Sequence, residues 1–527
     1  MNNKYIKHIV NLLFPCLIFA VITGFFSAIY ITGFKLLAEW VIHLSLTAYD
    51  FVRNNPEWLP LLILAVAIIG LIASLILCHS HTCRGGGIPT SIAAIRGIVN
   101  FKWLAAIILL PISSSLTFLA GLPLGTEGPC VQLGTAIGDG VIKCIGKEKY
   151  KGWHRYIMTG GASAGFSIAT SAPISAIVFS MEELHKHFSP LLLSVVSVSV
   201  LTAQATTQLL ASFGIGSVVF FHMPQIESLA PALLFAPLLV GLVSGVGSMF
   251  FTKLYHIVDQ FMYAILKRVT KLIVIPILFV LISIVGFFFA DSLGAGHSLV
   301  EALFESRSAW YVLILVFLIR AIGMTVSNTS GATGGIFLPT LAFGALLGAL
   351  CGNIMIKLGW IGSEHYILMV ILGVSAFLGA TSRIPLTACV FCVEALGGIN
   401  NILPIVIATT FALLTVEISG LEDLTDTVIH SKLNKLARGK QPHDIKVPLT
   451  VAKDSFVIGK ELRDVLWPNS CVVISFNRVD QTQINHTISE GDVITVRYST
   501  YTPASTMDEL HALVGEQSQD VISIMNP

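Results

Sequence analysis

Long apolar runs, separated by short polar segments or by Gly and Pro, occupy most of the chain from residue 9 to residue 420. Several runs are shorter than the roughly 20 residues that a helix needs to cross a bilayer. Short or interrupted membrane helices bury their ends in protein and line cavities, so the pattern predicts broken helices around an internal pathway. Apolar helices are expected near residues 9–40, 59–78, 103–123, 128–142, 157–180, 190–213, 229–253, 273–291, 310–327, 336–358, 366–380, 384–397 and 402–420.

Two segments share one glycine and proline spacing, Gly125-x3-Pro129-x4-Gly134-x3-Gly138 and Gly335-x3-Pro339-x4-Gly344-x3-Gly348. A second pair of segments, 163–184 and 375–396, aligns without gaps and places Glu182 opposite Glu394. Because each pair is separated by about 210 residues, the sequence predicts one internal duplication. The first membrane repeat is expected over residues 1–225 and the second over residues 226–440. The paired glutamates, present in both repeats, are interpreted as structural.

The proline of each glycine motif stands where a helix is expected to begin. Proline suits the first helical turn because its missing N–H would have no intrahelical partner there. The glycines before it let backbone amides turn toward a ligand, and a helix N-terminus carries about half a positive charge. Two such helix ends within a membrane predict an anion site.

The acidic residue Glu127 lies inside the first glycine motif, in a stretch from Trp103 to Ile142 that contains no Lys or Arg. An isolated charge near the centre of a bilayer costs at least about 2.5 to 3.5 kcal/mol, so one that is retained marks a functional site by default. Glu127 is therefore the first candidate functional residue.

Composition places most of the chain in a membrane. Of its 527 residues, 54% are hydrophobic and 12% are charged, whereas a soluble domain has about 25% charged residues. The formal net charge of +1 argues against a nucleic-acid partner. The nine cysteines are scattered, and Cys389 and Cys392 have no second ligand pair, so no metal site is expected.

Basic residues flank the apolar region on both sides. Because cytoplasmic segments are enriched in Lys and Arg, both termini are expected in the cytoplasm. Termini on the same side of the membrane are compatible with an inverted arrangement of the two repeats. They are equally compatible with a parallel arrangement. The basic flank and compact loops indicate a bacterial inner (plasma) membrane. The flanking residues are Lys4 and Lys7 before the first apolar run, and Lys432, Lys435, Arg438 and Lys440 after the last.

From about Gln441 the composition becomes that of a soluble protein, which predicts a small α/β cytoplasmic domain over residues 441–527. Strands are expected at Val447–Val451, Cys471–Phe476 and Val493–Tyr498, a turn at Gly491-Asp492, and a closing helix at Ser505–Val514. The patterns Gly459-Lys460-Glu461-Leu462-Arg463 and Gly491-Asp492-Val493-Ile494 resemble the TrkA-C regulatory module of other transporters. That resemblance implies a small ligand on this domain, whose identity the sequence leaves open.

Three ordered motifs give residues 1 to about 435 a resemblance to the CLC family of chloride channels and chloride/proton antiporters. They are Gly85-Gly86-Gly87-Ile88-Pro89, Gly125-Thr126-Glu127-Gly128-Pro129 and Gly334-Gly335-Ile336-Phe337-Leu338-Pro339. The resemblance implies an all-α polytopic membrane protein that forms a homodimer, in which each subunit is an inverted repeat with its own anion pathway. It also implies chloride and protons as the transported species, and no metal, cofactor or covalent step.

The resemblance assigns roles to individual residues. It makes Glu127 the gating glutamate, whose carboxylate occupies the anion site until protonation releases it. Glu183 matches the internal proton-accepting glutamate of the antiporters, where channels usually carry an apolar residue. The positions that it implies for chloride binding are Gly86, Gly87, Ile336, Phe337 and Thr425.

Two of these positions depart from the family's pattern. Gly86 replaces the usual serine, and Thr425 stands where the family has a tyrosine. Without those two side chains the inner gate is expected to be wider and less selective. Chloride/proton antiport is favoured by Glu183, and a passive chloride channel and an exchanger for nitrate or fluoride remain as alternatives.

One enzyme signature, Gly161-Ala162-Ser163-Ala164-Gly165, fits the G-x-S-x-G nucleophile elbow of hydrolases. No strand is expected before it, and part of it recurs in the second repeat as Gly373 and Ser375. Small residues at such positions allow helices to pack closely. The segment is therefore interpreted as a packing motif, and the protein as a transporter rather than an enzyme.

Overall fold

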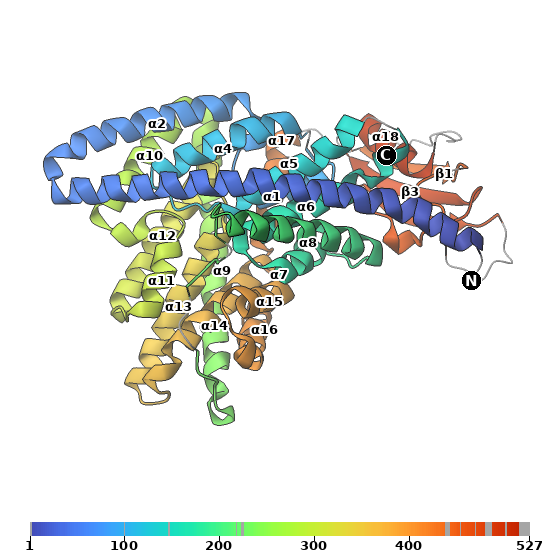
Figure 1. The fold of residues 1–527 in the computed structure, drawn as a ribbon. Helices are drawn as coiled ribbons and strands as arrows, with labels where there is room; N and C mark the ends of the chain where they lie inside the picture. The colour runs from blue at the N-terminus through green and yellow to red at the C-terminus, as the bar shows by residue number, and fades with distance from the viewer. Residues whose placement is uncertain are drawn as a thin grey trace.

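A computed structural model describes residues 3–99, 101–145, 148–217, 219–222, 226–437, 443–453, 455–468, 471–479, 487–500 and 503–515. The first half of the membrane region contains α1 (Asn3–Asn54), α2 (Leu59–His79), α3 (Gly87–Ile95), α4 (Trp103–Leu119), α5 (Glu127–Ile145), α6 (His154–Thr170), α7 (Pro173–Phe179), the π-helical turn η4 (Ser180–His185) and α8 (Pro190–Ser212). The second half contains α9 (Phe235–Arg268), α10 (Lys271–Phe288), α11 (His297–Glu305), α12 (Trp310–Ser330), α13 (Phe337–Lys357), α14 (Tyr366–Ser382), α15 (Pro385–Ala395), α16 (Ile402–Ile418) and α17 (Leu424–Ala437). Figure 1 shows these helices as one body, with a small sheet at the end where α1 begins.

Each predicted apolar run is helical in the structure, and one of them is divided into two helices. The run over residues 157–180 is two helices, α6 and α7, because the chain turns at Ser171, which has a left-handed φ of 54°. Pro173 then stands in the first turn of α7, where its missing N–H costs no hydrogen bond. The helices α3, α11 and α17 fall outside the predicted runs because the first two are short and the third is polar.

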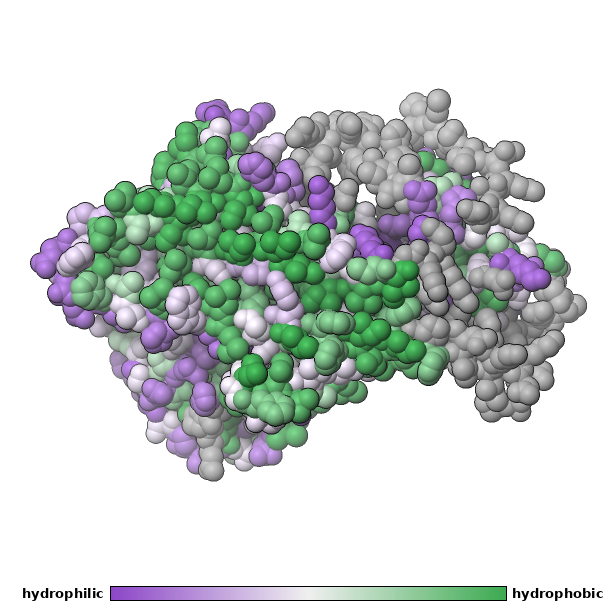
Figure 2. Space-filling view, turned by 45° about the horizontal axis from the view of Figure 1, so that its top comes forward, coloured by the Kyte–Doolittle hydropathy of each residue, from purple (hydrophilic) through white to green (hydrophobic). Residues whose placement is uncertain are grey.

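The helical body exposes apolar side chains to its surroundings. Among the described residues, nine helices are long and apolar enough to cross a membrane. Trp40, Leu64 and Phe261 are 63%, 57% and 64% exposed, as expected for side chains that face lipid. Figure 2 shows hydrophobic residues spread broadly over this face of the body. The chain is an integral membrane protein.

Glycines allow the central helices to pack at backbone distance in both repeats. A Cβ added to Gly134 of α5 would overlap the carbonyl of Gly161 in α6, and one added to Gly344 of α13 would overlap the carbonyl of Gly373 in α14. Gly161 to Gly165 therefore lies inside a helix and serves close packing, as the sequence predicted. Residues 154–160, which directly precede this segment, belong to the same helix, so the segment is not the strand-to-helix turn of a nucleophile elbow.

Reciprocal caps join the two repeats. The carboxylate of Glu182 accepts hydrogen bonds from Leu386 N (3.0 Å) and Thr387 N (2.7 Å) at the start of α15. The carboxylate of Glu394 accepts from Ile174 N (3.0 Å) and Ser175 N (2.9 Å) at the start of α7. A carboxylate at a helix N-terminus satisfies free N–H groups and complements the helix dipole. The structural interpretation of this glutamate pair is confirmed.

The C-terminal domain contains a three-stranded antiparallel sheet in the order β1-β3-β2. Its elements are β1 (His443–Thr450), β2 (Cys471–Asn477), β3 (Val493–Thr500) and α18 (Pro503–Val514). Val447, which pairs with Val496, is buried, as are Leu449 and Ile494. The predicted strands and closing helix are confirmed, and β1 begins four residues earlier than expected.

The basic flanks lie in parts of the chain about which the structure says little. Arg438 and Lys440 are outside the described residues, and so are the side chains of Lys4, Lys7, Lys432 and Lys435. In Figure 1 the first turns of α1 and the sheet of the C-terminal domain lie at the same end of the molecule.

Candidate functional site

The N-termini of α3, α5 and α13 meet at one buried place. Gly125 and Gly335 form an isolated antiparallel bridge, with Gly125 N donating to Gly335 O (2.8 Å) and Gly335 N donating to Gly125 O (2.7 Å). A Cβ added to Gly128 would lie 2.7 Å from Gly335 Cα and 3.0 Å from Gly87 N. The three glycine motifs of the sequence therefore come together, although they are far apart along the chain.

Such a convergence favours anions. The first four N–H groups of a helix have no intrahelical acceptor, and the helix dipole adds about half a positive charge at that end. Gly86 is the N-cap of α3, and Ile336 is the N-cap of α13. The ring of Phe337 packs against Phe166 and Phe391, with centroids 5.0 and 5.5 Å apart. That packing fixes the position of the first turn of α13.

Glu127 is the first residue of α5 and is 1% exposed. Its Oε1 accepts a 3.3 Å hydrogen bond from Thr126 Oγ1, and its Oε2 has no partner within the described part of the chain. A Cβ added to Gly125 would overlap Oε2 and would lie 3.3 Å from Leu338 Cβ. The carboxylate thus folds back over Gly125 toward the first turn of α13.

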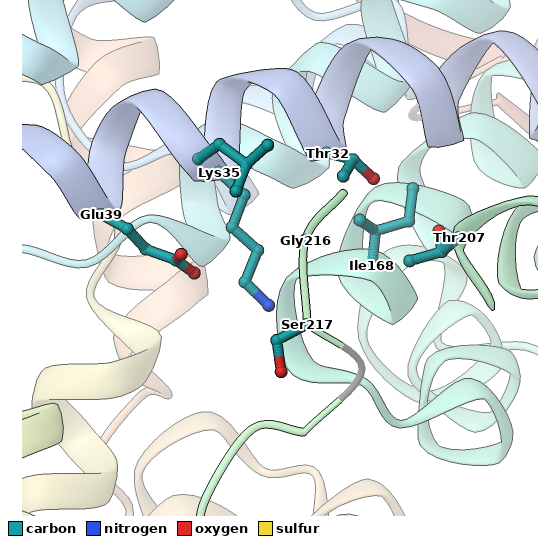
Figure 3. A pocket seen from close by; sticks show the side chains of 8 residues that line it. Thr32, Lys35, Glu39, Ile168, Thr207, Gly216 and Ser217 are labelled. Atoms are coloured by element: carbon teal, nitrogen blue, oxygen red, sulfur yellow. The ribbon is translucent and has the colours of Figure 1, made fainter. Parts of the chain in front are cut away.

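A small cavity of about 10 Å³, enough for about one water molecule, lies between α1, α6, α8 and the segment that follows α8. Its lining residues include Thr32, Lys35, Glu39 and Ser217. Figure 3 shows the Lys35 side chain extending from α1 toward the segment that carries Ser217. Lys35 also interacts electrostatically with Glu127, so a cation acts on the buried carboxylate from this cavity. Lys35 belongs to none of the sequence motifs.

A second buried carboxylate, Glu183 of η4, is 2% exposed. Its Oε1 accepts a 2.5 Å hydrogen bond from the hydroxyl of Thr425 in α17, and its Oε2 has no partner within the described residues. Lys186 binds Asp423 (2.8 Å) and Asp426 (2.6 Å), which flank Thr425. These ion pairs hold the end of η4 against the start of α17. No sequence pattern predicts them, because the partners are far apart in the chain.

Helix α3 connects the two carboxylate sites. Its first residue, Gly87, lies at the convergence with Gly128, and Arg96 at its other end donates to Leu184 O (3.4 Å), next to Glu183. α17 packs against α3 as well. Nine residues of α-helix at 1.5 Å each rise roughly 14 Å, so the two sites are separated by about the length of this helix.

The C-terminal domain docks beside the segment that carries Glu183. The Tyr156 hydroxyl at the start of α6 donates to Asp464 O and accepts from Leu466 N (3.2 Å). His187, two residues after the end of η4, contacts Arg463 O through Nε2 (2.6 Å). The domain therefore touches α6, which packs against η4, and the loop that follows η4.

Lys460 is buried in this interface, at 5% exposure. Its Nζ lies 3.1 Å from the centroid of the Phe456 ring and 5.0 Å from that of Trp153, and it donates to Phe456 O. Burial destabilises the charged form of Lys460 by more free energy than these contacts contribute. It therefore lowers the pKa of Lys460 from 10.5 to about 7.

Raising the pH above 7 is expected to stabilise the docked domain through Lys460. Between pH 7 and pH 10.5 the unfolded state binds more protons than the native state, so the free energy of unfolding rises with pH by at most about 1.4 kcal/mol per pH unit. Below pH 7 both states carry the proton and this contribution is constant. Thermal unfolding of wild type and Lys460→Met between pH 6 and pH 9 measures the difference, and identical pH profiles would contradict it.

Comparison with known proteins identifies the family of the membrane region. The family model described as voltage gated chloride channel matches residues 67–417. The H(+)/Cl(-) exchange transporter ClcA of Vibrio parahaemolyticus serotype O3:K6 is 29% identical over 428 residues, which cover 80% of this chain and 90% of that protein. The protein of the same name from Salmonella arizonae is 26% identical over 427 residues, covering 80% and 89%.

Solved structures share the fold. A slow cyanobacterial Cl⁻/H⁺ antiporter superimposes with a TM-score of 0.71 at 23% identity, covering 80% of this chain and 98% of the other. A CLC-type fluoride/proton antiporter gives a TM-score of 0.63 at 22% identity, covering 76% and 95%. With the matched motifs gathered at one site, the chain belongs to the voltage-gated chloride channel, or CLC, family.

Proposed function

We propose that the protein exchanges chloride for protons across the membrane. The observation that carries this proposal is the pair of buried carboxylates, Glu127 at the convergence of three helix N-termini and Glu183 about one helix away. The names of the relatives, which describe H(+)/Cl(-) exchange, support it. A carboxylate can carry a proton and can also stand in for an anion, so two of them suffice to couple the two fluxes.

Chloride is proposed to bind at the helix ends, held by backbone N–H groups of Ile336 and Phe337 and by the start of α3 at Gly86 and Gly87. Their buried position supports this assignment, because dipoles act strongly on a charge that has lost its water. Backbone donors are also independent of side-chain identity. The departures from the family pattern at Gly86 and Thr425 therefore leave this part of the site intact.

Glu127 is proposed to be the gate. As a carboxylate it carries the same charge as chloride and competes for the same helix N-termini. Protonation removes that charge, so the neutral side chain leaves the site and chloride takes its place. Glu183 is proposed to receive protons from the cytoplasmic side and to pass them toward Glu127. Each proton that reaches Glu127 thus opens the site to an anion, and no covalent step is needed.

Chloride-driven proton movement in liposomes tests this function. Vesicles that contain the purified full-length protein are loaded with high chloride and diluted into low chloride at equal internal and external pH. As chloride leaves, exchange predicts that protons enter and the outside becomes alkaline. A chloride efflux without any proton movement would instead identify a passive channel.

Thr425 is proposed to hold Glu183 in place for proton transfer. The variant Thr425→Val keeps the shape and removes the only donor that the described structure provides to Glu183 Oε1. A hydrogen bond to a charged group contributes enough to change an equilibrium about tenfold or more, so we expect about a tenfold lower proton flux per chloride. Thr425→Ser keeps the hydroxyl and is expected to keep the coupling. If Thr425→Val instead changes chloride affinity with coupling intact, Thr425 acts on the anion.

We further propose a homodimer in a bacterial inner membrane with both termini in the cytoplasm, and a regulatory role for the domain at residues 441–527. The contacts of Tyr156 and His187 with that domain support the regulatory role, because Tyr156 belongs to the helix that packs against η4 and His187 to the loop that follows η4. A small ligand that shifts this docking would change proton access. Light scattering in detergent tests the dimer, and transport by Tyr156→Phe tests the regulation.

A further inference from the structure

A buried side-chain amide stands beside the start of α3. Asn328 of α12 is 5% exposed. Its Oδ1 accepts a 2.7 Å hydrogen bond from the hydroxyl of Tyr255 in α9, which is itself 2% exposed. Because this bond engages the oxygen, it fixes the amide plane and leaves Nδ2 facing elsewhere. Within the described part of the chain, Nδ2 has no hydrogen-bond acceptor.

The free amide nitrogen faces the space in front of α3. A Cβ added to Gly86 would lie 3.3 Å from Asn328 Nδ2, and 3.7 Å from Gly334 O. Gly86 is the N-cap of α3, all nine residues of which are buried. Since Gly86 has no side chain, the Asn328 amide and the first N–H groups of α3 approach the same buried space. Gly334, whose carbonyl oxygen also lies beside this space, belongs to the segment that leads into α13.

Donors gathered in this way require an acceptor. A buried amide donor without a partner costs about 1–3 kcal/mol, and the N-terminus of α3 adds further donors and a partial positive charge. A cation is repelled by these groups, whereas a small anion without its water satisfies all of them at once. The ligand class is therefore a small inorganic anion.

We infer that the side-chain amide of Asn328, oriented by Tyr255, binds the transported anion together with the first turn of α3. This inference rests on the proposed function, because it takes chloride as the anion, and it adds a side-chain ligand to a site otherwise built from backbone. Tyr255 acts through Asn328 and is a positioning residue.

Chloride binding to the purified full-length protein, measured by titration calorimetry, tests the inference without depending on transport. Asn328→Leu removes the donor and is expected to weaken chloride binding about tenfold, and Asn328→Asp, which replaces the donor by an acceptor, more strongly. Tyr255→Phe leaves the packing intact and frees the amide to rotate, so a loss of about threefold is expected. The matched control is Thr329→Val, because among the described residues the Thr329 hydroxyl bonds only within α12, to Thr325 O (2.8 Å) and Val326 O (3.4 Å).

Equal chloride affinity in wild type, Asn328→Leu and Tyr255→Phe would overturn the inference and leave the proposed function standing. Absence of chloride binding in the wild type would overturn both. If Asn328→Leu does not fold, Tyr255→Phe decides: a weakened affinity at unchanged thermal stability supports the inference, and an unchanged affinity contradicts it.

Discussion

Replacing Glu127 by Gln is expected to abolish proton coupling while chloride still crosses the membrane. Glutamine has the shape of a protonated glutamate, so it neither competes with chloride for the helix N-termini nor carries a proton. Proton flux should fall at least about a hundredfold, the range found when a positioned proton-transfer group is lost. Paired measurements of chloride efflux and external pH in liposomes test this expectation.

Glu305→Gln provides the matched control for the gate. Glu305 ends α11 and is exposed to solvent, so the same chemical change there should leave both fluxes as in the wild type. Persistent proton coupling in Glu127→Gln would remove Glu127 from the proton path. It would also leave the unpaired Oε2 of Glu127 without a functional explanation.

Replacing Glu183 by Gln is expected to reduce proton flux about a hundredfold and to spare most of the chloride flux. Glu183 is bound by Thr425 in a second site, about one helix away from the convergence of helix ends. Its loss should therefore close the proton branch without altering the anion site. Simultaneous recordings of chloride and proton flux in the variant give this ratio.

The neighbouring residue Glu182 provides the control for Glu183. Glu182 caps α15 through Leu386 N and Thr387 N, so Glu182→Gln should lower the thermal stability and keep the ratio of protons to chloride. Equal loss of both fluxes in Glu183→Gln would reduce Glu183 to a structural role. Loss of coupling in Glu182→Gln would move the proton path to that residue.

The candidate anion site is predictable from the sequence because its residues lie in short contiguous motifs. Glycines followed by proline predict a helix N-terminus whose amides are free. Glu127 stands out in the sequence because an isolated charge in a membrane segment costs free energy. The duplication adds a second copy of the same signal, which predicts that two helix ends share a role. Their direct pairing through Gly125 and Gly335 follows only from the structure.

Contacts between distant segments are not predictable in this way. Thr425 and Glu183 are 242 residues apart, and Asn328 and Tyr255 are 73 apart. Neither pair belongs to a local pattern, because a threonine or asparagine in an apolar helix looks the same whether it bonds to its own helix or to a distant group. Ser171 is a related case: its left-handed turn interrupts an apolar run whose hydrophobicity gives no sign of a break.

The reversal potential of the wild-type protein in liposomes tests coupled exchange most directly. It is measured under a fixed chloride gradient, first at equal pH and then with an added pH gradient. Exchange through Glu127 and Glu183 predicts a potential that differs from the chloride equilibrium value and shifts when the pH gradient is imposed. A potential that stays at the chloride value under both conditions would contradict proton coupling and identify a chloride channel built on the same scaffold.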